Sequence, residues 1–428
     1  MSFQRNPETA LLLVGAERLE LPIVASNGRY QGIDVSKVRE ATGHVLVDPG
    51  AGNVSICAPS EITYLDGQEG ILQYRGYRIE ELANHSTFLE TAYLLIYGEL
   101  PTHAELQRFE TAIAAAPGLP ALATDSFLRS FGAAGHPMAV LQSAIAWLET
   151  QRPVLRQAES LEMEPVFFDL LRNVPALVAS WYAFRTRGEW VEFDPTDGYA
   201  KGLLQAFFPD ASHPQIFADV LETCLVVHAD HEQNCSTNTC RSIGSAQASL
   251  YASVAGAVGA LSGPLHGGAN EAVVAMLEDL LASGMTVADK LAEVKSGEAR
   301  LSGVGHRVYK NSDPRAERLK QLCPEVLRAA GNDSQLLDIA HQLENAVRED
   351  EYFRRRKLYP NVDFYSGILY KAMGIPVEFF TPMFAIGRLP GWIAHWVEGR
   401  EKKTRIYRPF QIYDGQSERP YVPIDART

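Results

Sequence analysis

Two histidines in glycine-rich segments are the first candidates for chemistry. His266 lies in PLHGGANEA (264–272), just before two glycines and a predicted helix start. The positive end of a helix dipole disfavours an imidazolium. We therefore expect a neutral His266 that can donate a hydrogen bond to a developing oxyanion or enolate. A glycine-rich loop with a capping histidine would be the structural interpretation of the same residues.

His306 lies in a second such segment, GVGHRVYKNSDPR (303–315). Lys310 and Arg315 follow it at short spacing. One titratable donor beside two cations is typical of a site for an anionic ligand. The alternative is a solvated basic loop, but the density of glycine, histidine, arginine and proline favours a site.

Asp363 stands among apolar and aromatic neighbours in RRRKLYPNVDFYSG (354–367). Desolvation would raise the pKa of such a carboxyl group and suit it to act as a general base. Four consecutive cations precede it in an otherwise acidic chain. Basic runs are usually solvated, but here a phosphate-bearing ligand would explain the concentration of charge.

A fourth cluster, HADHEQNCSTNTC (228–240), packs His228, Asp230 and His231 together. On a helix the two histidines could share a face, which raises the hypothesis of a metal site. The cysteines that follow do not complete a usual zinc spacing. Polar ligand contact, with His231 donating to a carboxylate, is the other interpretation.

Two arginines near the C-terminus complete the candidates. Arg388 lies in AIGRLPGW and Arg408 in RIYRPFQIY. Lone arginines are normally surface groups, but the planar guanidinium suits bidentate recognition of carboxylates.

The elements that position these residues are predicted to be mostly helical. The first 60 or so residues look extended, and EITYLDGQEGILQYRGY (61–77) alternates as strands do. A helical pattern begins at about Ile79 and runs to a Gly-Glu-Leu-Pro stop. The small-residue run at 242–263 predicts a tightly packed helix at an internal or subunit interface. Further helical patterns occupy 136–150, 164–184, 214–234, 270–283, 334–349 and 363–374.

Bulk properties exclude several classes of function. The 428 residues are 46% hydrophobic and 21% charged, which is typical of a globular protein. A net charge of −13 argues against broad nucleic-acid binding. The sequence has no run of about 18 apolar residues, so we expect no membrane span. Its N-terminal apolar patch has no basic segment before it, so we expect no signal peptide. Five cysteines at irregular spacing indicate reduced thiols and a cytoplasmic location.

Six motifs, in this order and spacing, resemble citrate synthase: HADHEQN, GPLHGGANEA, GVGHRVYKNSDPR, KLYPNVDFYSGI, FAIGRLPGWIAHW and RPFQIY. The resemblance extends from about residue 45 to about residue 415. The segment DPG…ITYLDGQEGILQYRGY is similar to the hexameric, Gram-negative-type branch of that family. The motif around His306 is the most specific, and that around Asp363 is nearly as specific.

The resemblance implies a role for each candidate. Asp363 would remove a methyl proton from acetyl-CoA, His266 would stabilise the enol, and His306 would protonate the oxaloacetate carbonyl. Citryl-CoA would then be hydrolysed to citrate and CoA, without a metal or other cofactor. Oxaloacetate would be held by His231, Arg315, Arg388 and Arg408, the last from a neighbouring subunit. Lys310, Arg354 and Arg356 would face the CoA phosphates.

The resemblance also implies a mainly α, two-domain fold. A β-rich segment (1–60) would precede a large helical domain (61–269 and 383–428). A small helical domain (270–382) would close over it once oxaloacetate has bound. The active unit would be at least a homodimer, or a hexamer as in the branch that the chain resembles.

One region departs from hexameric relatives that NADH inhibits. The stretch TAIAAAPG (111–118) has no basic side chain, and Asp169 and Asn173 stand where cations would be expected. An aspartate would repel a dinucleotide phosphate, so we predict that NADH does not inhibit this protein strongly.

Three alternatives remain open on the sequence. A 2-methylcitrate synthase would use the same residues with propionyl-CoA, and one methylene changes discrimination by only about 1–3 kcal/mol. A metal-dependent hydrolase would use His228, Asp230 and His231. A non-catalytic helical assembly protein would keep the fold without turnover, although the complete set of site residues speaks against it.

Overall fold

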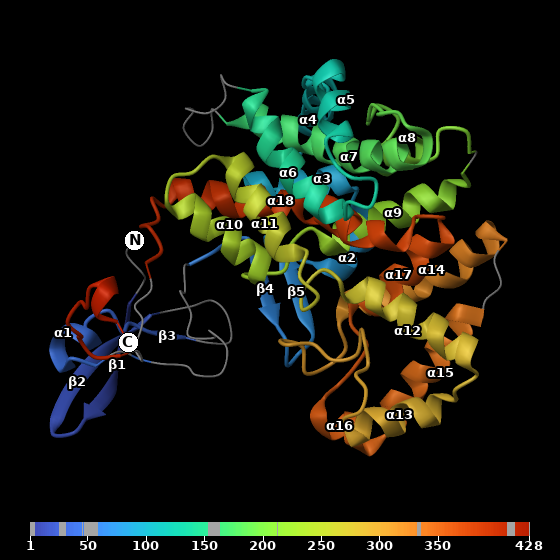
Figure 1. Cartoon of the computed structure of the whole chain (residues 1–428). Coiled ribbons are helices and arrows are strands. Elements are labelled where there is room, and N and C mark those ends of the chain that lie inside the picture. The colour runs from blue at the N-terminus through green and yellow to red at the C-terminus, as the bar shows by residue number, and fades with distance from the viewer. Residues whose placement is uncertain are drawn as a thin grey trace.

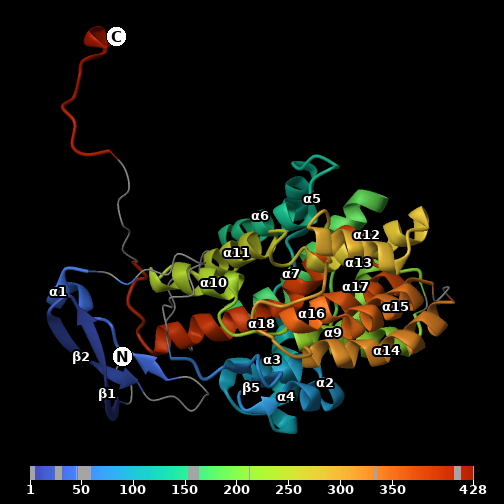
Figure 2. The ribbon, with the colours of Figure 1, turned by 90° about the horizontal axis from the view of Figure 1, so that it is seen from below.

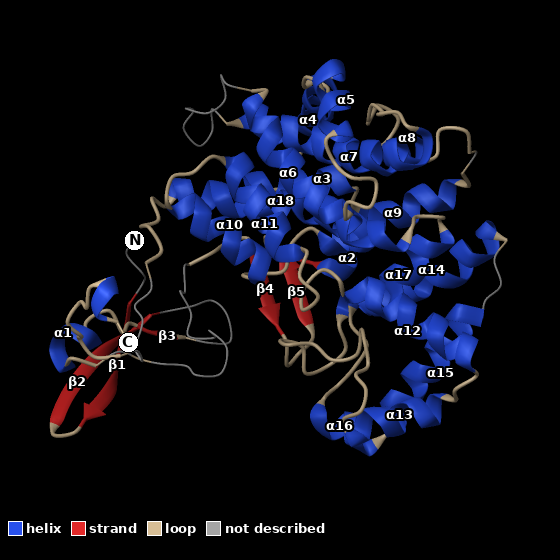
Figure 3. Ribbon diagram, viewed as in Figure 1, coloured by secondary structure: helices blue, strands red, loops and turns tan. Residues whose placement is uncertain are grey.

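The computed structural model describes residues 5–24, 31–44, 46, 59–152, 163–211, 213–331, 335–408 and 416–427. Figure 1 shows a small β-sheet unit beside a large helical body, and Figure 3 shows helices throughout that body. The predicted mainly helical fold with a small N-terminal β segment is confirmed. Among the described helices, none is both long and apolar enough to cross a membrane.

The described strands form two three-stranded sheets. They are β1 (Arg5–Val14), β2 (Glu17–Val24), β3 (Gly32–Ile33), β4 (Thr63–Asp66), β5 (Ile71–Tyr74) and β6 (Tyr77–Arg78).

The helices of the first half are α1 (Val38–Thr42), α2 (Ile79–His85), α3 (Phe88–Tyr97), α4 (His103–Ala115), α5 (Ala121–Arg129), α6 (Pro137–Thr150), α7 (Glu164–Arg187) and α8 (Tyr199–Phe207). Those of the second half are α9 (Gln215–His228), α10 (Cys235–Ser245), α11 (Leu250–Leu261), α12 (Ala269–Ser283), α13 (Val287–Ser296), α14 (Pro314–Ala330), α15 (Gln335–Glu349), α16 (Glu351–Arg356), α17 (Val362–Ala372) and α18 (Phe380–Glu401). Two short 3-10 turns are η2 (Val377–Phe379) and η3 (Ile424–Ala426).

The N-terminal sheet stands apart from the helical body in both views (Figures 1 and 2). Strands β1 and β2 pair antiparallel, with Leu12 opposite Leu19, and β3 adds the third strand. The expectation of extended chain is wrong at 38–42, which form the short helix α1. Half of the segment 41–50, which the sequence also predicts to be extended, lies outside the described residues.

The second sheet, predicted from the alternation at 61–77, is a hairpin against the helical body. Strands β4 and β5 pair antiparallel, with Tyr64 opposite Gln73. The turn is held by Asp66, whose Oδ1 accepts the backbone N–H of Gln68 at 2.9 Å and that of Glu69 at 3.2 Å. This turn projects toward the segment that carries His306.

Helix α2 begins at Ile79, as predicted, but the helical run that follows is two helices. Thr87 accepts the N–H of Glu90 at 3.1 Å, and the Glu90 carboxylate accepts the N–H of Thr87. This capping box starts α3, which ends at Gly98 with a left-handed φ of 96°. The small-residue run at 242–263 is likewise divided between α10 and α11, which pack on each other.

The described helix with the most buried residues is α18. It packs against α3, α7, α9, α10 and α11, and its apolar side chains, such as the fully buried Trp392, form much of the core. Two polar side chains, Arg388 and His395, are each 1% exposed on the same helix. A buried charge is costly unless it is paired, so these two positions mark functional candidates.

A second group of helices, α12 to α17, lies at one side of the body (Figure 1). Helix α17 packs on α12 and α14, and α15 packs on α12 and α13. We call this set the small helical group. The helices and loops of this group carry His306, Lys310, Arg315, Arg354, Arg356 and Asp363. Of the other candidates, Arg388 is on α18, and His231, His266 and Arg408 lie in segments that follow α9, α11 and α18. The expected domain boundary at 382 falls within the first turn of α18.

Candidate active site

His231 lies in a loop, because α9 ends at His228. The idea that these two histidines share a helical face is therefore wrong. The His228 ring is fully buried, and its Nδ1 lies 2.6 Å from the carbonyl oxygen of Cys224. His231 instead faces the small helical group: its ring centroid is 5.2 Å from that of His306, and its Nε2 is 3.3 Å from the hydroxyl of Tyr309. Burial, followed by the charge of Arg315, holds the pKa of His231 well below its usual range.

His306 has a defined tautomer. Its Nδ1 accepts the backbone N–H groups of Val308 at 3.0 Å and Tyr309 at 3.1 Å. A nitrogen that accepts hydrogen bonds carries no proton, so the neutral ring bears its proton on Nε2. Burial, followed by the charge of Arg315, lowers the pKa of His306 to about 4. Near neutral pH this residue is thus a neutral donor through Nε2.

His266 has the opposite tautomer to His306. Its Nε2 accepts the backbone N–H of Ser236 at 3.3 Å and lies 3.0 Å from the Ser236 hydroxyl, so the proton lies on Nδ1. Its pKa is lowered to about 4, first by burial and then by Arg388. The neutral imidazole was predicted, but burial outweighs the helix start as its cause. Helix α12 begins only at Ala269.

Asp363 is in the first turn of α17, where the Asn361 side chain accepts its backbone N–H at 3.0 Å. Its Oδ1 is buried and has no hydrogen-bond partner within the described part of the chain. Burial raises the pKa of Asp363 to about 7, although Arg315 and Arg388 oppose the rise. The expected elevation is therefore present, and the free oxygen can accept a proton.

Two buried arginines face the same region, and they differ in how fully their guanidinium groups are already hydrogen-bonded. Arg315 forms a bidentate pair with Asp313, with Nε–Oδ1 at 3.0 Å and Nη2–Oδ2 at 2.8 Å. Arg388 donates from Nε to the carbonyl oxygen of His228 at 2.6 Å, while its buried Nη1 has no partner among the described residues. Burial lowers the pKa of Arg388 to about 10. A cation in this state presents an unused donor to an anionic ligand.

The remaining candidates lie farther out. Arg408 is exposed beyond α18, next to Tyr407, whose backbone N–H donates to Ser245 on α10 at 2.9 Å. Lys310 donates from Nζ to the carbonyl oxygen of Arg307 at 3.3 Å. Arg354 and Arg356 are exposed in the last turn of α16, and Arg356 stacks 3.7 Å above the Tyr352 ring. A basic last turn also suits the helix dipole, so the cationic run has a structural explanation as well.

The model of the family described as "Citrate synthase, C-terminal domain" matches residues 50–410. This chain belongs to the citrate synthase family. Among curated relatives, citrate synthase 1 of Mycobacterium tuberculosis is 42% identical over 98% of this chain and 99% of its own length. The citrate synthase of Corynebacterium glutamicum is 42% identical over 99% of this chain and 98% of its own length.

Solved citrate synthase structures share the fold. That of Pyrobaculum aerophilum matches with a TM-score of 0.78 at 38% identity and covers 90% of this chain and 98% of its own. The Thermoplasma acidophilum enzyme, solved as a ternary complex with carboxymethyl coenzyme A and oxaloacetate, matches with a TM-score of 0.80 at 30% identity. It covers 88% of this chain and 98% of its own. The predicted family is confirmed.

For this citrate synthase, two supporting residues escaped the sequence argument. Ser236 sets the proton position on His266, and Asp313 holds Arg315 while its Oδ2 also accepts the N–H of Val362 at 3.1 Å. Asp313 could have been found, because an aspartate before proline is a helix-start signal. Ser236 had no such signal, since its contact with His266 joins different elements.

The geometry does not support a metal site built on His228, Asp230 and His231. Within the described residues, no group of three or more histidine, cysteine, aspartate or glutamate side chains is arranged to hold a metal ion. The Asp230 carboxylate lies 3.3 Å from Nε2 of His395, whereas His231 faces Tyr309 and His228 faces the Cys224 carbonyl. The three side chains thus point to three different partners.

The region compared with an NADH site has a different arrangement from the one expected. Asp169 is buried and pairs with Arg152 at 2.9 Å, and Asn173 donates to it at 2.9 Å. Arg152 in turn donates to the carbonyl oxygens of Pro117 and Gly118 at 3.1 and 3.0 Å. The carboxylate therefore holds an internal ion pair, so its repulsion of a phosphate is largely neutralised. Weak inhibition by NADH stays a prediction.

Proposed function

We propose that this protein joins acetyl-CoA to oxaloacetate and hydrolyses the resulting citryl-CoA, as an acyltransferase of the tricarboxylic acid cycle. One observation carries the proposal: two neutral histidines of opposite tautomer and an aspartate of raised pKa lie around two buried arginines. Arg388, which is partly unsatisfied, acts on His266 and Asp363, and Arg315 acts on His306 and Asp363. Such a set can activate a weakly acidic carbon and an electrophilic carbonyl at the same site. The identity to curated citrate synthases supports the same activity.

The first step is enolisation. The free Oδ1 of Asp363 takes a proton from the acetyl methyl group, and Nδ1–H of His266 donates to the thioester oxygen as charge develops on it. A base alone would be insufficient for so weak an acid, so a preorganised donor must meet the oxyanion. A pKa of about 7 gives Asp363 enough basicity to share this proton near neutral pH.

The second step is condensation. The enol carbon attacks the keto carbon of oxaloacetate, while Nε2–H of His306 gives its proton to the keto oxygen, which becomes the hydroxyl of citryl-CoA. Water then attacks the thioester carbonyl, the C–S bond breaks, and CoA leaves as the thiol. The proton that Asp363 took replaces the one that His306 gave. A proton of the attacking water goes to the thiolate of CoA, and the new carboxyl group releases one proton to solvent.

Oxaloacetate binding falls to the cationic groups around this centre. Arg388 offers its unpartnered Nη1, His231 and Arg315 lie close to His306, and Arg408 reaches the site of a neighbouring subunit. A dianionic substrate suits this cluster because charge-assisted bonds to carboxylates are strong. Lys310, Arg354 and Arg356 take the CoA phosphates. The Thermoplasma relative, solved with oxaloacetate and a CoA analogue, supports these ligand classes.

The larger assembly follows from these roles. Residues 270–382 close over residues 61–269 and 383–428 after oxaloacetate binds, which shields acetyl-CoA from hydrolysis. A homodimer is the minimal active unit, because Arg408 acts in the partner's site, and a hexamer of the Gram-negative type is its larger form. The protein acts in the cytoplasm.

Product analysis tests the reaction. Purified protein with acetyl-CoA and oxaloacetate should form citrate and free thiol in a 1:1 ratio, with no thiol released when oxaloacetate is left out. Propionyl-CoA in the same tube should compete poorly. Thiol release without citrate would contradict the proposed reaction, and a preference for propionyl-CoA would favour the 2-methylcitrate alternative.

A further inference from the structure

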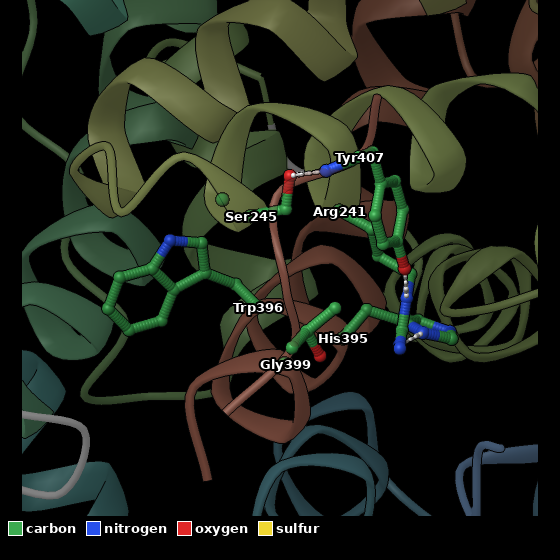
Figure 4. A pocket seen from close by; sticks show the side chains of 8 residues that line it. Arg241, Ser245, His395, Trp396, Gly399 and Tyr407 are labelled. Carbon is green, nitrogen blue, oxygen red and sulfur yellow. Dashed lines mark hydrogen bonds between the residues drawn. The ribbon is translucent and has the colours of Figure 1, made fainter. Parts of the chain in front are cut away.

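A chain of buried polar side chains lies behind His231 and has no part in the steps above. Figure 4 shows two of its members, Arg241 and His395. It consists of Asp230, His395, Arg241 and Glu398, which are 0%, 1%, 4% and 4% exposed. His395 lies 3.3 Å from Asp230 and 2.9 Å from Arg241, and Arg241 pairs with Glu398 at 2.8 Å. Buried polar groups in such a row must satisfy one another, so each fixes the orientation of the next.

The proton on His395 can be located from its partners. A guanidinium only donates, so Nη1 of Arg241 donates to Nδ1 of His395. The proton of the neutral ring is therefore on Nε2, and it is donated to Oδ2 of Asp230. His395 thus links the two side chains: Arg241 fixes the orientation of the His395 ring, and the ring fixes the orientation of the Asp230 carboxylate.

The Asp230 carboxylate holds the loop that presents His231. Its Oδ2 also accepts the Thr63 hydroxyl at 2.5 Å and the backbone N–H of Glu232 at 3.1 Å. Glu232 has a φ of +53°, a conformation that non-glycine residues rarely adopt. His231 lies between the anchoring carboxylate and this strained residue, so its ring position depends on the anchor.

The other end of the row reaches the C-terminal segment. Nε of Arg241 donates to the hydroxyl of Tyr407 at 3.4 Å, and the backbone of Tyr407 is bound by Ser245 (Figure 4). Arg408 is the next residue. One continuous hydrogen-bonded row therefore joins Asp230 and Tyr407, the chain neighbours of His231 and Arg408, the two residues proposed to bind oxaloacetate.

The space beside this row is too small for a ligand. Arg241, His395 and Tyr407 line a cavity of about 10 Å³, which is close to the least volume that holds one water molecule. A substrate or cofactor cannot enter it. The row therefore acts through what it positions, and not by binding a molecule of its own.

We infer that His395 is a positioning residue, which through Asp230 orients the His231 loop in its own oxaloacetate site and through Arg241 orients the Tyr407–Arg408 segment that serves the partner's site. This inference rests on the proposed function, because it takes oxaloacetate as the ligand of His231. It predicts that loss of the row weakens oxaloacetate binding and leaves the handling of acetyl-CoA largely unchanged.

The test is the affinity for oxaloacetate alone, measured by titration calorimetry on the full-length protein, with KM values measured in parallel. His395→Phe keeps the ring but removes both hydrogen bonds, and should raise the Kd for oxaloacetate about tenfold. The KM for acetyl-CoA at saturating oxaloacetate should stay within about twofold. His395→Gln, which can both donate and accept, should restore most of the affinity.

Trp396→Phe is the matched control. Trp396 is 3% exposed on the same helix and lines the same small cavity, but its ring N–H donates outside the row, to the carbonyl oxygen of Ala248 at 3.3 Å. The variant loses this one hydrogen bond. It should leave the Kd for oxaloacetate unchanged. An equal loss of affinity in Trp396→Phe, or wild-type affinity in His395→Phe, would overturn the inference.

Tyr407→Phe tests the Tyr407 end of the row. It provides a second test of the inference if His395→Phe does not fold. It should raise the Kd for oxaloacetate about threefold, since the lost bond is long. Combined with His395→Phe it should add little, because both act through Arg241. No change in Tyr407→Phe, or fully additive effects, would contradict the row. A wild-type protein that binds oxaloacetate but releases no CoA would contradict only the proposed function.

Discussion

At the scale of single residues, burial sets the chemistry of the site. It lowers the pKa values of His266 and His306 to about 4 and raises that of Asp363 to about 7. Between these values both histidines are neutral donors, while the aspartate changes from acid to base. The roles of donor, acid and base are thus separated by environment, although all three side chains share one region.

The pH dependence of kcat/KM follows from these shifts. The base must be ionised, so activity should fall as the pH drops through about 7 and should reach a plateau above it. The histidines should add no further limb between pH 5 and pH 8, because they protonate only near pH 4. Initial rates at low acetyl-CoA across pH 5–9 measure this profile. A flat profile between pH 6 and pH 8 would show that Asp363 has an ordinary pKa.

The contribution of Asp363 to the free energy of unfolding should depend on pH in the opposite direction to activity. Because the pKa of Asp363 is raised from 3.8 to about 7, the folded state binds its proton more tightly than the unfolded state does. The contribution of this group is therefore fully present below about pH 4 and is lost as the pH rises through about 7. Asn resembles the protonated form, so Asp363→Asn should be more stable than the wild type at pH 8, by up to about 4 kcal/mol. Denaturant unfolding at pH 8 and pH 5 checks whether this difference shrinks in acid.

At the scale of elements, close backbone approach positions His266. Gly267 lies where α11 and α18 leave no room: a Cβ there would be 2.5 Å from the carbonyl oxygen of Leu261 and 2.8 Å from Cγ2 of Thr381. The backbone of Gly267 already bonds to both residues, at 2.9 and 3.0 Å. The His266 ring is thus held through the chain beside it as well as through Ser236.

Gly267→Ala should therefore move His266 and lower kcat by about 100-fold, the usual effect of a misplacement of about 1 Å. The loss should exceed that expected from any change in the Tm. Gly263→Ala is the control in the same loop, because its Cβ would meet only the carbonyl oxygen of Ala260, at 3.6 Å. Steady-state kinetics and thermal unfolding of both variants decide the point, and equal rates would refute it.

The elements also show what the sequence could predict. Helix starts with local signals were found: Ile79 opens α2, and the predicted helix at 136–150 is α6, which begins at Pro137. The break between α10 and α11 was missed, because small residues continue through it and give no change of period. The partial burial of Asp363 could be predicted from its apolar neighbours.

Other features of the site could not be read from the sequence. The hydrogen bonds of His266 to Ser236 and of His395 to Asp230 join residues far apart in the chain. Such pairings arise only from the packing of α10, α18 and the loops between helices. The tautomers of the histidines, and hence which nitrogen can act, follow from these contacts alone.

At the scale of the molecule, the β4–β5 turn meets the small helical group. The backbone N–H of Lys310 donates to the carbonyl oxygen of Gly67 at 2.7 Å, and Lys357 lies 3.4 Å from the side chain of Gln68. A Cβ on Gly67 would overlap the carbonyl oxygen of Val308. This contact joins the two parts of the chain that are proposed to close on each other.

Gly67→Ala should hold those parts apart. Overpacking of this kind costs about 1–3 kcal/mol, so kcat/KM for acetyl-CoA should fall roughly 10- to 100-fold. Small-angle scattering should show less compaction on adding oxaloacetate than in the wild type. Gly132→Ala, whose Cβ would meet open space, should behave as the wild type in both measurements. Full compaction and normal kinetics in Gly67→Ala would argue against closure at this contact.

The central claim, that Asp363 is the base of an oxaloacetate-dependent condensation, is tested most directly by thiol release in Asp363→Asn beside the wild type. The wild type should release CoA only when oxaloacetate is present. The variant should lose about 10²- to 10⁴-fold in kcat, while its Kd for oxaloacetate stays within about threefold. Thiol release by Asp363→Asn within tenfold of the wild-type rate, at saturating substrates, would contradict the account.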